Sequence, residues 1–269
     1  MMLELKLRLL WILRDLHERA ERIPSMGGHK IGRVLQKVAF EAPTNTAIVE
    51  VGCWLGAGTA QLALGVRDRE APDSIVLHCY DRWTASPNEV RKAAQAGVSI
   101  EEGADTLPFT RDTLVPFGVQ IQFHKGDLFN ATWRDGSISV FIDDASKLPE
   151  PFHHVLFTFG PHWIPGETIV VFMDFHIWKQ THSDDHGCQQ RFVEANSECF
   201  EAIEFGGKKY KSTFAVFRYL APIEALSSGS LRDRWRIWLQ LCGKSGLVDM
   251  FVSGRWRDIV HIFRMWWRR

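Results

Sequence analysis

Five short apolar, β-branched runs recur along the middle of the chain, and helical patterns separate them. Such runs, bounded by Gly, Pro or Asp, are typical of buried strands. We expect strands over residues 47–51, 74–80, 119–124, 138–142 and 168–173, and helices over residues 57–69, 87–96, 105–116, 151–159 and 185–198. This alternation predicts an α/β fold with a doubly wound, Rossmann-like and mostly parallel sheet.

The pattern changes near both ends of the chain. Runs at 202–205 and 213–219 flank a Gly-Gly-Lys-Lys stretch and predict a C-terminal antiparallel hairpin. Helical patterns over 2–23, 31–40 and 231–269 predict helical extensions at the N- and C-termini. The expected organisation is an N-terminal helical cap (1–44), one α/β domain (45–220) and a basic, Trp-rich helical tail (221–269).

A glycine-rich turn follows the first expected strand, where the sequence from Ala47 to Thr59 reads A-I-V-E-V-G-C-W-L-G-A-G-T. Gly52, Gly56 and Gly58 lack a Cβ, so they can take positive φ or let a ligand approach the backbone closely. Glu50 precedes these glycines, which separates the pattern from the dinucleotide fingerprint G-x-G-x-x-G. The turn either holds a nucleoside-like ligand or only connects a strand to a helix.

Acidic residues follow the other four expected strands. Asp81 and Asp127 follow the second and third, Asp143 and Asp144 the fourth, and Asp174 the fifth. In an open parallel sheet, ligands bind outside the carboxyl ends of the strands, where an acid can accept hydrogen bonds from ribose hydroxyls. Asp also favours turns in general, so a single one of these positions would decide nothing.

Together, these residues resemble the class I S-adenosylmethionine (SAM)-dependent methyltransferases. The arrangement E-x-G-x-x-x-G-x-G-T resembles the first motif of that family, and over residues 45–220 the chain is most similar to the macrocin and catechol types of small-molecule O-methyltransferase. The resemblance implies SAM as cofactor, with the loop after the third strand over the adenine. Trp83 lies against the adenine or fills the adjacent loop. The implied cofactor-binding residues are Glu50, Gly52, Gly56, Gly58, Asp81, Trp83, Gly126 and Asp127.

Many enzymes of this family hold Mg²⁺ with carboxylates after the fourth and fifth strands. The family pattern I-D-G-D-x reads I-D-D-A-S over residues 142–146 here, and D-D-[YF] reads M-D-F over residues 173–175. Either Asp144 acts from a shifted position or the metal is absent. The resemblance implies Mg²⁺ ligands Asp143, Asp144 and Asp174, and catalytic residues Asp143, Asp174 and His176.

The segment after the fifth expected strand is rich in His and Asp. His176, His182 and His186 lie there with Asp184 and Asp185, in a spacing that matches no known metal signature. It is a polar loop, the source of a histidine general base, or a transition-metal site. His153 and His154 fall in an apolar helix and are interpreted as structural.

The amino-acid composition narrows the expected cellular compartment and the expected class of partner. The 269 residues carry a formal net charge of zero, which gives no global attraction to nucleic acid. Five cysteines without a C-x-x-C pair fit a reducing cytoplasm. No apolar run approaches the roughly 20 residues of a membrane span. We therefore expect a cytoplasmic protein whose partner is a small-molecule or sugar acceptor rather than nucleic acid.

The tail over 231–269 differs from the average composition. It holds five of the eleven tryptophans and nine Lys or Arg against three Asp, a local charge of +6. Its helices either pack on the domain or on a second subunit of a homo-oligomer, or bind peripherally to the anionic inner face of a membrane.

Two functions follow from the resemblance. The first is SAM-dependent methyl transfer to a hydroxyl of a small or sugar-containing acceptor, in polysaccharide or natural-product biosynthesis. The alternative is a methyltransferase-fold protein with a lost metal site that acts as a binding or assembly component in a membrane-linked glycan pathway. Relatives that do oxidative chemistry at the metal position form a third, minor class.

Overall fold

The computed structural model describes residues 15–26, 29–203 and 213–242. Two compact units, Met1–Asp127 and Leu128–Arg269, make up the chain. The Gly-Gly turn of the expected hairpin and the tail beyond residue 242 lie outside the described residues.

The first unit contains three parallel strands with helices packed on them. The strands, in the order β3-β2-β1, are β1 (Thr46–Val51), β2 (Ile75–Asp81) and β3 (Ile121–Lys125). The helices are α2 (Gly32–Glu41), α3 (Ala57–Arg67), α4 (Pro87–Gln95) and α5 (Leu107–Leu114), and residues 15–22 are also helical. Ser86 caps α4 in a full capping box with Glu89, and Pro87 takes the first helical position. The local sequence signals therefore account for where α4 begins.

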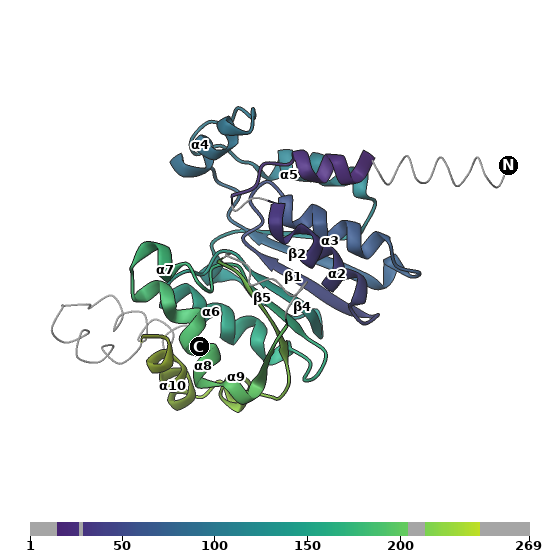
Figure 1. Cartoon of the computed structure of the whole chain (residues 1–269). Coiled ribbons are helices and arrows are strands. Elements are labelled where there is room, and N and C mark those ends of the chain that lie inside the picture. The colour runs from purple at the N-terminus through teal and green to yellow at the C-terminus, as the bar shows by residue number, and fades with distance from the viewer. Residues whose placement is uncertain (1–14, 27–28, 204–212, 243–269) are drawn as a thin grey trace. The chain divides into compact units, whose positions relative to one another are not determined.

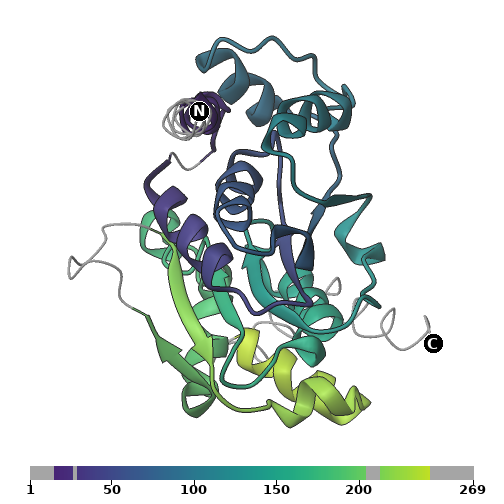
Figure 2. The same cartoon turned by 90° about the vertical axis from the view of Figure 1, so that its right-hand side faces the viewer.

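Helix α3 is almost entirely buried, because α2 packs against it on one side and the strands lie on the other. Gly65 permits the close approach of the two helices: a Cβ there would lie 2.1 Å from the carbonyl oxygen of Gln36. Figures 1 and 2 show α2 and α3 side by side. The rigid pair fixes the start of α3, directly after the glycine turn.

The second unit has four strands in the order β4-β5-β7-β6. Strands β4 and β5 are parallel, while β7 is antiparallel to both β5 and β6. The strands are β4 (Ile138–Asp143), β5 (Ile169–Phe172), β6 (Phe200–Ala202) and β7 (Ala215–Tyr219). The helices are α6 (Pro149–Phe159), α7 (Trp178–Thr181), α8 (Cys188–Ala195), α9 (Glu224–Ser228) and α10 (Leu231–Cys242). An aromatic core holds this unit together, in which Phe152 packs edge-on against both Phe172 and Phe192.

The strand order β3-β2-β1-β4-β5-β7-β6 confirms the expected fold class. It is a mostly parallel seven-stranded sheet with antiparallel strands at its C-terminal end. Three details differ from expectation. The expected helix over 185–198 is divided into a 3₁₀ turn (Asp185–Gly187), α8 and a second 3₁₀ turn (Ser197–Cys199), and β6 begins at Phe200 rather than at residue 202. Helix α7 falls in a segment expected to be a polar loop.

Helix α10, the first part of the expected tail, packs against α6, α8 and α9 (Figure 1). Trp238 and Leu241 are buried, and the Nε and Nη2 groups of Arg191 on α8 donate to the carbonyl oxygen of Leu241. Packing therefore accounts for residues 231–242, while residues 243–269 lie outside the described part. None of the described helices combines the length and apolar character that a membrane span requires.

Candidate functional site

In the first unit, the chain leaves β1 through a turn with two left-handed glycines. Gly52 has φ 92° and Gly56 has φ 90°, values that strain any residue with a Cβ. The Gly52 N–H donates to the carbonyl oxygen of Tyr80 at 2.8 Å, which ties the turn to β2. Gly56 is the N-cap of α3 and provides no side-chain acceptor for the first-turn N–H groups. An uncapped helix N-terminus of this kind suits an anionic ligand group.

Asp81, at the end of β2, links the parts of this turn. Its Oδ2 accepts the N–H of Trp54 at 2.8 Å, and its Oδ1 accepts the N–H of Trp83 at 2.7 Å. Its carbonyl oxygen accepts the N–H of Gly126, beyond β3, at 3.0 Å. Burial raises the pKa of Asp81, and the two N–H donors oppose that rise. The expected cofactor residues Gly52, Asp81 and Gly126 are thus brought to one edge of the strands, with Asp127 following in the exposed loop.

Glu50 is buried beneath the glycine turn and does not lie on its exposed side. Its side chain is only 4% exposed, and the Thr59 hydroxyl on α3 donates to its carboxylate. A Cβ on Gly58 would lie 2.2 Å from Glu50 Oε1, so the glycine makes room for this carboxylate. Burial raises the pKa of Glu50 to about 7. Glu50, Thr59 and Gly58 therefore form a support that holds the start of α3 against β1.

Two thiols lie beside this support. Ligand atoms of Glu50, Cys53 and Cys79 lie within 4.8 Å of one another, which is the single metal-sized His/Cys/Asp/Glu group among the described residues. Burial raises the pKa of Cys53 well above its usual value, so the thiol stays protonated near neutral pH. Its Sγ donates to the carbonyl oxygen of Glu50. These contacts describe a packed core beneath the turn.

Trp83 is buried, with 1% exposed, in a cluster with Cys53, Cys79 and Leu107. Its Nε1–H donates to the carbonyl oxygen of Trp54 at 2.9 Å, and the hydroxyl of Thr110 on α5 donates to the same oxygen at 3.0 Å. Trp83 therefore fills the loop beside Asp81. The sequence analysis missed Trp54, Thr59 and Thr110, of which Thr59, at the first turn of the helix after the glycines, gave the clearest signal.

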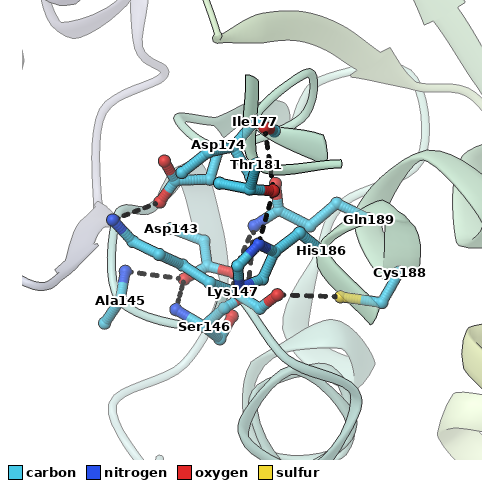
Figure 3. Close-up of polar contacts among 10 residues, drawn as sticks. All are labelled: Asp143, Ala145, Ser146, Lys147, Asp174, Ile177, Thr181, His186, Cys188 and Gln189. Carbon is cyan, nitrogen blue, oxygen red and sulfur yellow. Dashed lines mark hydrogen bonds and ion pairs between the residues drawn. The ribbon is translucent and has the colours of Figure 1, made fainter. Parts of the chain in front are cut away.

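In the second unit, Asp143 at the end of β4 is completely buried (Figure 3). Its Oδ1 accepts the N–H groups of Ala145 and Ser146 at 3.2 and 3.0 Å. Its Oδ2 accepts the Ser146 hydroxyl and, at 3.1 Å, the side-chain amide of Gln189 on α8. Burial raises the pKa of Asp143 to about 6 against these four donors. A carboxylate has about four lone-pair sites, so the chain itself satisfies all of them.

Asp174, after β5, has a different kind of partner. Its Oδ2 forms an ion pair with the Nζ of Lys147 at 3.2 Å. The carboxylate side chain is 9% exposed, whereas that of Lys147 is 46% exposed. Burial raises the pKa of Asp174, while the positive charges of Lys147 and His186 lower it. Figure 3 shows Lys147 reaching from the loop after β4 to this carboxylate.

The histidines after β5 do not gather into one site. His176 is half-buried, and within the described part of the chain its buried Nδ1 has no hydrogen-bond partner. Burial lowers the pKa of His176, and the charge of Lys179 adds to this effect. His182 is exposed at the left-handed end of α7, and His186 Nδ1 lies 2.7 Å from the Thr181 hydroxyl. His153, as interpreted, is buried in α6, with its Nε2 3.0 Å from the carbonyl oxygen of Arg234.

These contacts do not fit the Mg²⁺ site that the family resemblance implies. Mg²⁺ needs carboxylate oxygens with free lone pairs in octahedral geometry. The Asp143 oxygens already accept four donors, and Asp174 is paired with an ammonium group. Asp144 is half-buried and Ala145 brings no ligand. Sequence reasoning missed Ser146, Lys147 and Gln189, and no spacing signal points to Gln189, which lies 46 residues beyond Asp143.

Comparisons with known proteins extend these observations. No protein-family profile and no curated protein sequence matches the chain. A search of solved structures finds CalS11, a calicheamicin methyltransferase, at 17% identity and TM-score 0.50, covering 70% of this chain and 76% of that one. It also finds MycE from the mycinamycin pathway with Mg and SAH, at 12% identity and TM-score 0.44, covering 79% of this chain and 55% of that one.

The 23S rRNA methyltransferase ErmE is a third match, at 17% identity and TM-score 0.40, covering 79% of this chain and 78% of that one. At such low identity, the likeness to CalS11 shows the fold alone. The fold is that of the SAM-dependent methyltransferases, as the sequence analysis expected.

Proposed function

We propose that this protein is a SAM-dependent methyltransferase that acts on a hydroxyl of a small or sugar-containing acceptor. One observation carries the proposal: the Asp81 carboxylate is held at the strand edge by N–H groups of Trp54 and Trp83, between left-handed glycines and Gly126. Backbone donors on both carboxylate oxygens fix the orientation of Asp81 before any ligand arrives, which lowers the entropy lost on binding.

The residues of the first unit fit the chemical groups of SAM. Asp81 would accept hydrogen bonds from the ribose hydroxyls through its remaining lone pairs. The uncapped start of α3 would receive the carboxylate of the amino-acid part. Apart from its two chain neighbours, no described residue has a heavy atom within 4 Å of where a Cβ on Gly126 would be, which leaves room for an adenine. When bound, SAM supplies an electrophilic methyl group on a sulfonium.

On the acceptor side, we assign His176 as the general base. Its lowered pKa keeps the imidazole neutral near pH 7, and a neutral imidazole can take the proton of an acceptor hydroxyl through a ring nitrogen. Asp143 positions the loop after β4, because the N–H groups of Ala145 and Ser146 bind its carboxylate. Under this assignment, Asp143 is a positioning residue and does not touch the substrate.

The four hydrogen-bond donors that occupy the Asp143 carboxylate, which we call its closed shell, also favour a second candidate function. A protein with this fold and no metal site can bind SAM or its product without turnover and serve as a binding or assembly component. SAM binding occurs in both functions, so binding alone does not separate them. Methyl transfer to an acceptor separates them.

Two measurements on the full chain test the proposal. Calorimetric titration with SAM and with its demethylated product should show one binding site. Transfer of a radiolabelled methyl group from SAM should then be found with one member of a panel of nucleotide sugars, glycosides and phenols. The rate should fall on acidification with a pKa below 6.5, the ordinary value for histidine, and His176→Asn should remove that dependence. Absence of SAM binding would overturn the proposal.

A further inference from the structure

Resting on the proposed function, we infer that the ammonium group of Lys147, held by Asp174, binds the acceptor oxygen in this enzyme in place of a divalent cation. The inference concerns one pair of side chains in the second unit. It assigns a role to Lys147, and it says that methyl transfer proceeds without a metal.

The first step of the argument is that Asp143 is closed to a metal. Its four acceptor positions are occupied by the Ala145 and Ser146 N–H groups, the Ser146 hydroxyl and the Gln189 amide. Three of these donors come from the two residues that directly follow Asp144, so the loop itself must unfold locally before Asp143 can coordinate an ion. Ion binding would therefore lose several hydrogen bonds to a charged group, which are among the stronger hydrogen bonds in a protein.

The second step is that a cation is already present. Asp174 is nearly buried, and a buried carboxylate needs hydrogen-bond donors or a positive partner to remain ionised. The Nζ of Lys147 meets this need at 3.2 Å from Oδ2. Lys147 comes from the same loop that Asp143 holds in place, so the closed shell of Asp143 also positions the ammonium group (Figure 3).

The third step is that the ammonium group keeps the capacity to bind a ligand. An ammonium group has three N–H donors, and the ion pair with Asp174 involves a single carboxylate oxygen. The side chain is 46% exposed, so a ligand oxygen can reach the other donors. A positive donor favours an oxygen that gains negative charge as its proton leaves, which is the change an acceptor hydroxyl undergoes in methyl transfer.

This geometry also indicates the acceptor class. A lysine ammonium is a compact point charge that donates to one or several oxygens without the fixed fork of a guanidinium. It suits a hydroxyl flanked by a second oxygen, as in a vicinal diol or a sugar phosphate. We therefore expect such acceptors to be preferred over isolated hydroxyls.

The test compares the wild-type chain with Lys147→Met, Lys147→Arg and Asp174→Asn. Binding of Mn²⁺, a spectroscopic substitute for Mg²⁺, is followed by electron paramagnetic resonance with the demethylated product of SAM present. We expect no stoichiometric site in the wild type at submicromolar to millimolar Mn²⁺. A single Mn²⁺ site that disappears in Asp174→Asn would overturn the inference, whether or not an acceptor is known.

The functional arm uses the acceptor identified in the panel. Chelation should leave the methyl-transfer rate unchanged, Lys147→Met should lower it by about 100-fold, and Lys147→Arg should recover part of the loss. Equal rates in the wild type and Lys147→Met would overturn the inference. SAM affinity should be the same in all four proteins. Failure of the wild type to bind SAM would overturn the proposed function, whereas the Mn²⁺ result bears only on the further inference.

Discussion

The two units contain matching pairs of acids, and the pairs differ in how they are neutralised. In each unit, the first strand carries a buried acid at or next to its last residue, Glu50 or Asp143, that binds a hydroxyl from the segment after it. In each, the next strand along the chain leads into a second acid, Asp81, which is half-buried, or Asp174, which is nearly buried. Asp81 is satisfied by neutral backbone N–H groups, whereas Asp174 is satisfied by the charge of Lys147.

The difference shows what each acid can do. Neutral donors leave Asp81 with its full negative charge, which suits the recognition of hydroxyl groups. An ammonium partner makes Asp174 half of a neutral pair, so the group presented to a ligand is the cation. The buried acids Glu50 and Asp143 present nothing to a ligand and hold their segments in place. Similar placement after parallel strands thus supports three separate roles.

The pH dependence of stability should show the largest effect and distinguishes the two buried acids. Burial raises the pKa of Glu50 from 4.5 to about 7 and that of Asp143 from 3.8 to about 6. A carboxyl with a raised pKa stabilises the folded chain while protonated, and that contribution is lost as the pH rises through the folded-state pKa. Each acid should therefore lower the free energy of unfolding by about 3 kcal/mol over its own window.

Chemical denaturation between pH 4 and pH 8 measures this loss. Glu50→Gln should remove the part lost between pH 4.5 and about 7, and Asp143→Asn the part lost between pH 3.8 and about 6. Profiles of both variants that run parallel to the wild type would contradict the burial of these acids.

The second prediction concerns the support beneath the glycine turn. Gly58→Ala places a Cβ 2.2 Å from Glu50 Oε1, and the buried carboxylate has little room to move. The free energy of unfolding should fall by about 2 kcal/mol. Gly126→Ala is the matched control, because no described residue other than its chain neighbours lies within 4 Å of its Cβ position, so the free energy of unfolding should be unchanged. In a Glu50→Ala background, Gly58→Ala should lose most of its effect, and additive losses would show that the two residues do not interact.

Sequence reasoning succeeded where the signal was local. The strands, the glycine turn and the Ser86 cap depend on neighbouring residues, and the alternation of strands and helices was sufficient to predict the sheet. Sequence reasoning assigned Glu50 to the cofactor, because a motif gives the residue type and spacing but not how deeply the side chain is buried. Whether the acid lies beneath the turn or is exposed beside it depends on which face of β1 carries it and on how α3 packs there.

The four hydrogen bonds to the Asp143 carboxylate could not be predicted from the sequence, for a different reason. Its fourth donor, Gln189, comes from α8, and only the tertiary packing of α8 brings it to Asp143. The departure from the family pattern at Ala145 was visible in the sequence. The pairing of Lys147 with Asp174 was not, since it depends on the path of the loop that Asp143 holds.

The third prediction tests the expected cofactor site beside Asp81, the acid that is bound by neutral N–H groups. Gly126→Ala adds a methyl group where we expect the adenine, while leaving the backbone donor to Asp81 in place. The dissociation constant for SAM should rise by about fivefold, roughly 1 kcal/mol, with stability unchanged. Gly52 is less informative, because its φ of 92° strains any side chain and mixes folding with binding. An unchanged calorimetric affinity would remove Gly126 from the cofactor site.

The smallest effect on stability is expected from Lys147→Met, which removes the positively charged partner of Asp174. The pair is partly solvated because Lys147 is 46% exposed, so its loss should lower the free energy of unfolding by about 1 kcal/mol or less near neutral pH. The pKa of Asp174 should rise further, since the ammonium charge that opposes the effect of burial is gone. Raising NaCl from about 0.05 M to about 0.5 M should shrink the difference between wild type and variant, because salt screens exposed charges.

Lys125→Met, which breaks the exposed pair with Asp105 in the first unit, is the control. Denaturation at both salt concentrations should show little change for it. A salt-independent loss of several kcal/mol in Lys147→Met would mean that the lysine stem is structural. A small, screened loss combined with a large loss of methyl transfer would instead separate the stability role of Lys147 from its role at the acceptor.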